Sequence, residues 1–134
     1  MTTIDYSFDR PISATQLQPL LQQTSWAKGR SIDGIQAMLE GTAIVLGAWE
    51  DDRLIGFARA ITDNTYRALI DDVVIDTPQR GQGIGSSLLH QLVKRLTEME
   101  VEEVFLRCGD QVVPFYQRLG FETSDGITMD LGQD

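Results

Sequence analysis

The chain has 134 residues, 42% of them hydrophobic, and its 11 basic and 20 acidic side chains give a net charge of −9. This length and apolar content suit one domain with its own core, so we expect a single domain over residues 1–134. The charge argues against nucleic acid and anionic membranes as partners and weakly favours cationic substrates such as amines.

A cytoplasmic location is expected from three features of the sequence. Cys108 is the single cysteine, which rules out an intrachain disulfide and suits a reducing compartment. The first residues lack the basic and apolar regions of a signal peptide. No apolar run approaches the ~20 residues that span a bilayer.

The N-terminal third of the chain predicts a strand followed by two helices. Apolar and polar residues alternate over residues 4–8, as in a short strand. Ser13 and Gln16 have the spacing of a capping box, although Pro19 would then bend the helix or delay its start. Ser31 predicts the N-cap of a second short helix with an inward apolar face.

Three strands are predicted next. The apolar segments 42–49 and 54–61, joined by an acidic turn, predict a hairpin, and residues 66–75 predict a third strand. Gly56 inside the second segment predicts a bulge or a close backbone approach.

The remainder of the chain predicts helix, strand, helix and strand. Leucines at helical spacing over residues 84–96 predict the long helix, and residues 104–108 predict a buried strand parallel to the strand before it. A short helix over residues 112–119 should end at Gly120, and residues 127–131 predict a final strand. This order predicts a mixed α/β sheet, mostly antiparallel with one parallel βαβ unit, rather than a doubly wound sheet.

Between the third strand and the long helix lies a glycine-rich turn. Glycine lets the backbone approach a ligand and take positive φ, and a helix N-terminus offers free N–H groups and a positive dipole end. The turn therefore predicts a pyrophosphate cradle. A dinucleotide-binding fold is disfavoured because Ser86 stands at the third glycine position and no carboxylate ends the next strand. A Walker A loop lacks its Gly-Lys-Ser/Thr.

Two motifs carry a family resemblance. The first is Arg80-Gly81-Gln82-Gly83-Ile84-Gly85, and about thirty residues later comes Phe115-Tyr116-Gln117-Arg118-Leu119-Gly120-Phe121. Together they resemble the GNAT superfamily of acetyl-CoA-dependent N-acetyltransferases. Some strand segments also resemble its small single-domain branch, which includes the arylalkylamine (serotonin) N-acetyltransferases of plants.

The resemblance implies a GNAT-like fold whose strands splay apart around acetyl-CoA. It implies that the cofactor's pantetheine arm adds to the third strand like a further strand, through backbone groups of Val73, Val74 and Ile75. It also implies that the coenzyme A pyrophosphate binds backbone amides of Arg80, Gly81, Gln82, Gly83, Ile84 and Gly85, together with the hydroxyl of Ser86. Many members hold the pantetheine with an asparagine seven residues before the tyrosine, where this chain has Gly109.

The resemblance further implies that Tyr116 donates a proton to the departing thiolate. A tyrosine that only packs at a helix–sheet contact is the alternative. Cys108 is expected to be a buried small side chain rather than an acetyl-accepting nucleophile. His90, the only histidine, lies on the polar side of its helix and has no expected role, and no cluster of metal ligands is found.

Asp71 is the weaker candidate, for the general base. Relatives supply a base from this strand at positions that match Leu69 or Asp71, and Leu69 cannot serve, so ordered water linked to Asp71 is a further alternative. Pairing of Asp71 and Asp72 with Arg59 or Arg67 is equally open. Side-chain alternation places Asp71 on the face of Leu69, Val73 and Ile75 and places Asp72 on the other face.

The expected reaction is transfer of acetyl from acetyl-CoA to a primary amine by direct attack on the thioester. A protein lysine or N-terminus as acceptor and a non-enzymatic acyl-CoA-binding module stay open as alternatives, and the chain is expected to be a monomer or a homodimer. The acceptor should lie between the N-terminal helices and the third strand. Candidates to line its site are Trp26, Lys28, Arg30, Trp49 and Arg59; for Trp26, a core position is favoured over an aromatic wall.

Overall fold

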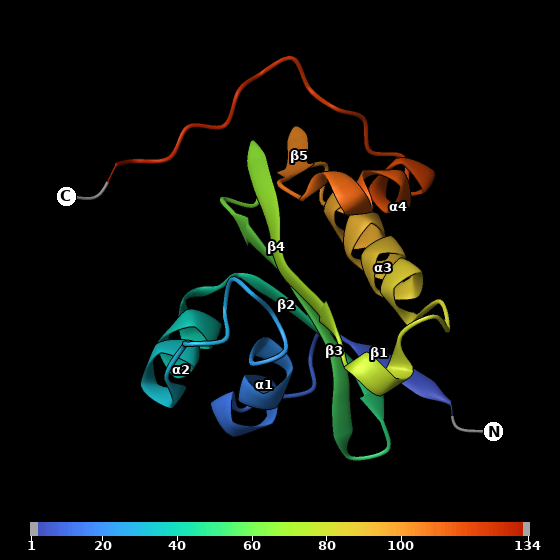
Figure 1. The fold of residues 1–134 in the computed structure, drawn as a ribbon. Helices are drawn as coiled ribbons and strands as arrows, with labels where there is room; N and C mark the ends of the chain where they lie inside the picture. Colours follow the sequence, from blue (N-terminus) through green and yellow to red (C-terminus); the bar gives the residue numbers. More distant parts are fainter. Residues whose placement is uncertain (1–2, 133–134) are drawn as a thin grey trace.

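The computed structural model describes residues 3–132, and its centre is one five-stranded sheet in the order β1-β2-β3-β4-β5. Neighbouring strands are antiparallel from β1 to β4, whereas β4 and β5 are parallel. Figure 1 shows α1 and α2 on one face of the sheet and α3 on the other. The expected mixed α/β fold is confirmed.

The strands are β1 Ile4–Ser7, β2 Ile44–Glu50, β3 Arg53–Thr62, β4 Arg67–Ile75 and β5 Glu103–Leu106. The α-helices are α1 Ala14–Leu21, α2 Ile32–Gly41, α3 Ile84–Glu98 and α4 Val113–Arg118, with 3-10 turns at Thr77–Gln79 and Asp110–Val112.

The two N-terminal helices begin where their caps predict. Ser13 accepts from the Gln16 amide at 3.1 Å, and the Gln16 side chain accepts from the Ser13 amide at 3.0 Å, which completes the capping box. Pro19 lies inside α1, and the helix ends two residues beyond it. Ser31 caps α2 by accepting from the Gly34 amide at 3.0 Å.

The hairpin of β2 and β3 also forms as predicted, with Gly56 at a close approach. A β-carbon added at Gly56 would lie 3.0 Å from Cδ1 of Ile75 and 3.2 Å from Cβ of Ala48. The register of the hairpin shifts beside Ala48. Any larger residue at position 56 would therefore push β2 and β4 away from β3.

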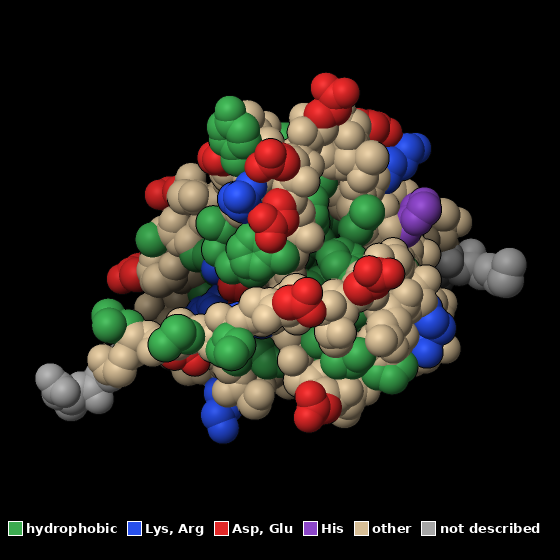
Figure 2. Space-filling view, turned by 90° about the horizontal axis from the view of Figure 1, so that it is seen from above, with side chains coloured by type: hydrophobic (Ala, Val, Ile, Leu, Met, Phe, Trp, Pro, Cys, Tyr) green, Lys and Arg blue, Asp and Glu red, His purple; other side chains and the backbone are tan. Residues whose placement is uncertain are grey.

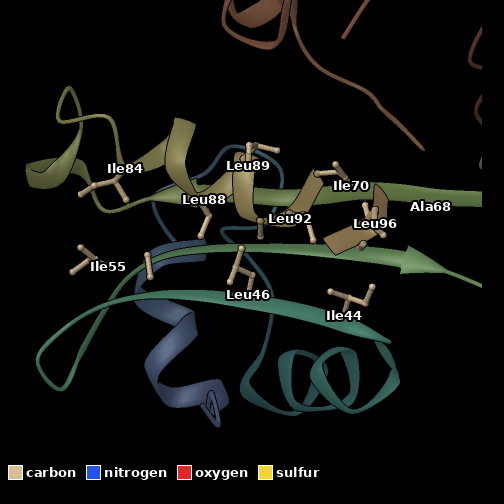
Figure 3. Packing of buried hydrophobic residues seen from close by; sticks show 13 residues of the cluster. Ile44, Leu46, Ile55, Ala68, Ile70, Ile84, Leu88, Leu89, Leu92 and Leu96 are labelled. Atoms are coloured by element: carbon tan, nitrogen blue, oxygen red, sulfur yellow. The ribbon is translucent and has the colours of Figure 1, made fainter. Parts of the chain in front are cut away.

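Apolar side chains fill both sides of the sheet. On one side, α3 presents buried leucines to the sheet, and Figure 3 shows Leu88 and Leu92 above Leu46, which projects from β2. On the other side, α1 and α2 cover a second cluster that contains Leu17, Ile35 and Phe57. The sheet is thus held between two apolar layers, which keeps β4 in a defined position.

The C-terminal segment departs from the sequence prediction. The strand predicted over residues 127–131 is absent, and Figure 1 shows this segment as irregular chain that crosses above the ends of β4 and β5. Ile127, Met129 and Leu131 are 87%, 88% and 94% exposed, and Figure 2 shows apolar side chains standing out along the tail. Alternation predicts a strand only where an adjacent strand can pair with it and one face is buried, and this segment has neither.

The parallel strand is shorter and more exposed than predicted. β5 ends at Leu106, so Cys108 lies beyond it, and Phe105 is largely exposed. The prediction of a buried strand was wrong because helices cover only part of this edge. Within residues 3–132, no helix has both the length and the apolar character needed to cross a bilayer.

Candidate functional site

A bulge in β4 determines which side chains face the N-terminal helices. Phe57 pairs with Val74 and Arg59 pairs with Asp71, so one residue of β3 lies opposite two residues of β4. Asp72 has φ 54°, in the left-handed region that aspartate tolerates better than most residues. Asp71 and Asp72 consequently both contact Arg59.

The bulge overturns the predicted alternation along this strand. Val73 and Ile75 pack against the core beneath α3, whereas Val74 belongs to the cluster beneath α1. Asp71 therefore does not share a face with Val73 and Ile75. The physical reason is the extra residue of the bulge, because it moves each later side chain of β4 to the face of the sheet opposite the predicted one.

Beyond the bulge, β4 and β5 separate. The two strands pair only from Arg67 to Ile70 on β4, so the outward backbone edge of β4 has no strand partner from Asp71 onward. A cleft of about 1260 Å³ lies at the separation. Its lining includes the predicted site residues Asp71, Val73 and Tyr116, together with Trp26, Arg30, Asp72, Cys108 and Gln111.

The glycine turn lies at the N-terminus of α3. Gly81 and Gly83 have φ of 84° and 79°, and Gly83 caps the helix without a side-chain hydrogen bond. Within residues 3–132, the amides of residues 81–86 donate to no protein acceptor, and the first bonded amide is that of Ser87, to the Gly83 carbonyl at 3.1 Å. These free donors and the helix dipole can bind an anion.

The two motifs of the sequence meet at one contact. A β-carbon added at Gly85 would lie 3.5 Å from Cζ of Phe115, an ordinary contact distance, so α4 packs closely against the start of α3 here. Arg80 turns back toward β4 and donates from Nε to the Ile75 carbonyl at 3.0 Å. The loop does not line the cleft itself, and it lies next to the cleft through α4 and the end of β4.

Tyr116 lines the cleft from α4 with its ring partly buried. Its ring meets Phe115 and Phe121 edge to face, with centroids 5.0 Å and 6.0 Å away. Burial, with the nearby Cys108 thiol, raises the pKa of Tyr116 above its ordinary value. The phenol is therefore protonated at neutral pH and can donate a proton. Cys108 is exposed, which corrects the expectation of a buried thiol.

Asp71 is partly exposed at the same cleft. Its Oδ2 lies 3.6 Å from Nη2 of Arg59, and its Oδ1 accepts from the Asp72 amide at 2.9 Å. Arg67 instead pairs with Glu102 and Glu103, at 2.6 Å and 3.0 Å. Of the two arginines considered from sequence, Arg59 is thus the partner of both aspartates.

The expected acceptor residues divide into two groups. Trp26 is 57% exposed and lines the cleft with Arg30, so the preference for a core Trp26 was wrong. Trp49 is buried in the cluster under α1, with the guanidinium of Arg10 over its ring at 3.8 Å, and does not reach the cleft. The side chain of Asp72 is fully buried and pairs with Arg59, which was one of the alternatives from the sequence, and also with Arg30, which sequence reasoning missed. Two consecutive aspartates inside an apolar strand were the available signal.

Among the residues that the structure describes, no three His, Cys, Asp or Glu side chains are grouped so that they could hold a metal ion. A family model described as an acetyltransferase (GNAT) domain matches residues 18–132. The chain belongs to the GNAT acetyltransferase family. The resemblance carried by the two motifs is thereby confirmed.

Individual GNAT proteins resemble the chain over most of its length. The uncharacterized N-acetyltransferase ycf52 of Porphyra purpurea is 34% identical to this chain, and the match covers 87% of this chain and 69% of that relative. The histone acetyltransferase TAP1 of Glycine max is 32% identical over 92% of the chain, which spans 58% of that relative. A GNAT family acetyltransferase structure from Streptococcus pneumoniae has a TM-score of 0.81 at 24% identity, covering 99% of this chain and 98% of that one, and shares the fold.

Proposed function

We propose that the protein transfers the acetyl group of acetyl-CoA to a primary amine on a small molecule. The separation of β4 from β5 is the observation that carries this proposal, because it leaves a strand edge unpaired beside a potential proton donor. Membership of the GNAT family supports acetyl transfer as the reaction.

The residues present fit acetyl-CoA at two points. The amides of residues 81–86 are unpaired within the described chain and lie at a helix N-terminus, which suits the pyrophosphate. The backbone edge of Val73, Val74 and Ile75 has no strand partner toward β5, which suits an extended amide-bearing arm. Gly109 takes the place of the asparagine that the resemblance leads us to expect, so Gln111, which lines the cleft, is the available amide side chain there.

Acetyl-CoA supplies an activated thioester. The amine nitrogen bonds to the thioester carbonyl carbon as the carbon–sulfur bond breaks. Tyr116 donates its phenolic proton to the departing sulfur, since a phenol is protonated at neutral pH and burial raises the pKa of this one further. Asp71 accepts the proton that the amine loses, directly or through water, and Arg59 lies beside this carboxylate at 3.6 Å.

The lining of the cleft supports a cationic acceptor with an apolar body. Trp26 offers an exposed aromatic surface and Asp71 offers a partly exposed carboxylate. The chain's net charge of −9 would raise the local concentration of amines over that of anionic substrates. A cytoplasmic location, where acetyl-CoA and reduced Cys108 would coexist, is part of the same proposal.

The test is a thiol-release assay with acetyl-CoA and a panel of primary amines that includes tryptamine, tyramine and spermidine. We expect release of coenzyme A that depends on the amine, together with a rise in melting temperature on addition of acetyl-CoA but not of NAD. Stabilisation by acetyl-CoA without turnover of any amine or peptide would instead indicate a binding module.

A protein lysine is the second candidate acceptor, favoured by the relative named histone acetyltransferase TAP1. Mass spectrometry of lysine-containing peptides incubated with acetyl-CoA distinguishes the two acceptors. Faster acetylation of peptides than of any free amine would replace the small-molecule proposal.

A further inference from the structure

The carboxylate of Asp72 is completely withdrawn from solvent and accepts three hydrogen bonds. Oδ2 accepts from Nη1 of Arg30 and from Nε of Arg59, each at 2.8 Å, and Oδ1 accepts from Nε1 of Trp26 at 3.0 Å. Charge-assisted bonds of this length to a buried carboxylate are strong, and removing the acceptor takes this partner from two partly buried guanidinium groups.

These donors connect separate parts of the fold. Arg59 is on β3, where its Nη1 also donates to Thr42 at 3.1 Å. Trp26 and Arg30 belong to the non-helical segment between α1 and α2, and both line the cleft. The Asp72 carboxylate thus links the segment between α1 and α2, which forms one wall of the cleft, to β4, which carries the other wall.

Gln23, at the start of the segment, bonds to Asp76 and Thr77, and Ala27 packs into the cluster beneath α1. Around Trp26 and Arg30 themselves, apart from the bonds to this carboxylate, the hydrogen bonds are mainly short-range. Ala27 donates to Thr24 at 2.9 Å and Arg30 donates to the Ala27 carbonyl at 3.2 Å, while Gln18 donates to the Arg30 carbonyl at 3.3 Å. Short turns of this kind do not by themselves define where Trp26 and Arg30 stand relative to β4.

We propose that Asp72 is a positioning residue for the acceptor, which holds Trp26 and Arg30 against the reacting end of the cleft while touching neither acceptor nor thioester. This inference rests on the proposed acetyl transfer. The bulge at Asp72 places its carboxylate beneath the segment and its backbone beside Asp71, so the same residue sets both the acceptor wall and the partly exposed carboxylate.

Two substitutions separate the side chain from the backbone. Asp72→Asn keeps the shape and tolerance of positive φ. It is neutral, however, and its single acceptor oxygen cannot take the place of both Oδ1 and Oδ2, so it cannot accept from Trp26 and from the two arginines together. Asp72→Gly keeps the bulge and removes the side chain. Asp76→Asn is the matched control, since Asp76 is also buried and paired, with Arg53 and with Gln23 at 2.8 Å, and does not line the cleft. It contacts the segment only at its start, through Gln23, and bonds to neither Trp26 nor Arg30 within residues 3–132.

The first measurement is amide hydrogen exchange by NMR at Ala27 and Arg30. We expect about tenfold faster exchange in both Asp72 variants and no change at these two amides in Asp76→Asn, because local opening no longer breaks the carboxylate bonds. Unchanged exchange at Ala27 and Arg30 in Asp72→Asn would overturn the inference. This readout needs no substrate, so it decides even if no amine is acetylated.

The second measurement separates KM from kcat with the panel amine that gives the highest kcat/KM. In Asp72→Asn we expect the amine KM to rise about tenfold or more and the acetyl-CoA KM to change less than about threefold, as for a loss of acceptor positioning. Trp26→Phe keeps an aromatic ring but removes the N–H group that donates to Asp72. In the Asp72→Asn background, this substitution should therefore add little further effect on the amine KM. Equal increases in both KM values, or full additivity, would mean that Asp72 is only structural.

Discussion

At the scale of single residues, burial favours the neutral form of both central ionisable groups, yet their pKa values shift in opposite directions. Burial raises the pKa of Tyr116, and the nearby Cys108 adds to this effect. Burial would also raise the pKa of Asp72, but hydrogen bonds from Arg30 and Arg59 outweigh it and hold that pKa below its ordinary value. One group is thereby kept neutral and the other charged within the same cleft.

Replacing Tyr116 with phenylalanine tests the proton donor. The ring packing against Phe115 and Phe121 is preserved, so the fold should persist while kcat falls by about 100-fold or more, the range expected for a lost general acid. Stopped-flow thiol release and a pH–rate profile check this. Normal turnover in Tyr116→Phe would reduce Tyr116 to a packing residue.

Asp72 should also shape the acid stability of the fold. Because its folded pKa is depressed, ionised Asp72 stabilises the fold fully above the unfolded pKa of about 3.9, and this contribution is lost as pH falls through the lower folded pKa. The difference in unfolding free energy between wild type and Asp72→Asn, from urea titrations, should therefore shrink as pH falls below about 4. A difference independent of pH would contradict the charged pairing.

At the scale of elements, the glycine turn combines two distinct requirements. Gly81 and Gly83 have left-handed φ with open space around the missing side chain, whereas Gly85 is helical and faces the ring of Phe115. The first two are needed for backbone conformation, whereas a methyl group at the third would make only ordinary contact with Phe115 of α4. The sequence pattern predicted the turn, and the different roles follow from the backbone angles.

Alanine at Gly83 and at Gly85 should therefore have different effects. Gly83→Ala should lower the unfolding free energy by about 1 kcal/mol, because alanine is strained at positive φ. Gly85→Ala should leave it unchanged or raise it by up to about 1 kcal/mol, since alanine favours a helix and 3.5 Å is ordinary contact. Chemical denaturation of both variants measures this, and equal losses would refute the assignment.

The β4 strand shows where prediction from the sequence stopped. Its position and limits followed from apolar residues bounded by turns, and β4 begins within a residue of the predicted start. The bulge at Asp72 could not be predicted, because it depends on how β3 pairs across from it and on donors from Arg30 and Trp26, about 40 residues earlier in the chain. The predicted faces of Asp71 and Val73 were wrong for that reason.

At the scale of the whole molecule, the core and the tail differ sharply. The leucines of α3 are fully buried against the sheet, while the apolar side chains of residues 127–131 extend into solvent. One exposed ion pair, Arg107 with Asp130 at 2.9 Å, joins the tail to the chain after β5. Such a pair adds little stability, so the tail contributes far less than α3.

Serine substitutions in the tail test this contrast. Ile127→Ser combined with Leu131→Ser should change the unfolding free energy by less than about 0.5 kcal/mol, as expected for exposed sites. Leu92→Ala, on the face of α3 that packs against the sheet, should cost about 2–5 kcal/mol. If the tail double variant is destabilised by more than 1 kcal/mol, its apolar side chains are buried in solution.

The sequence by itself determined the order and type of elements, the glycine turn and the family, because caps, periodicity and left-handed glycines are local properties of the chain. The tertiary structure alone decided three things: the bulge at Asp72, the exposure of Trp26 and the unpaired tail beyond Phe121. Each depends on contacts between residues far apart in sequence. A side chain's burial and a strand's partner are set by what folds against them, which no local pattern contains.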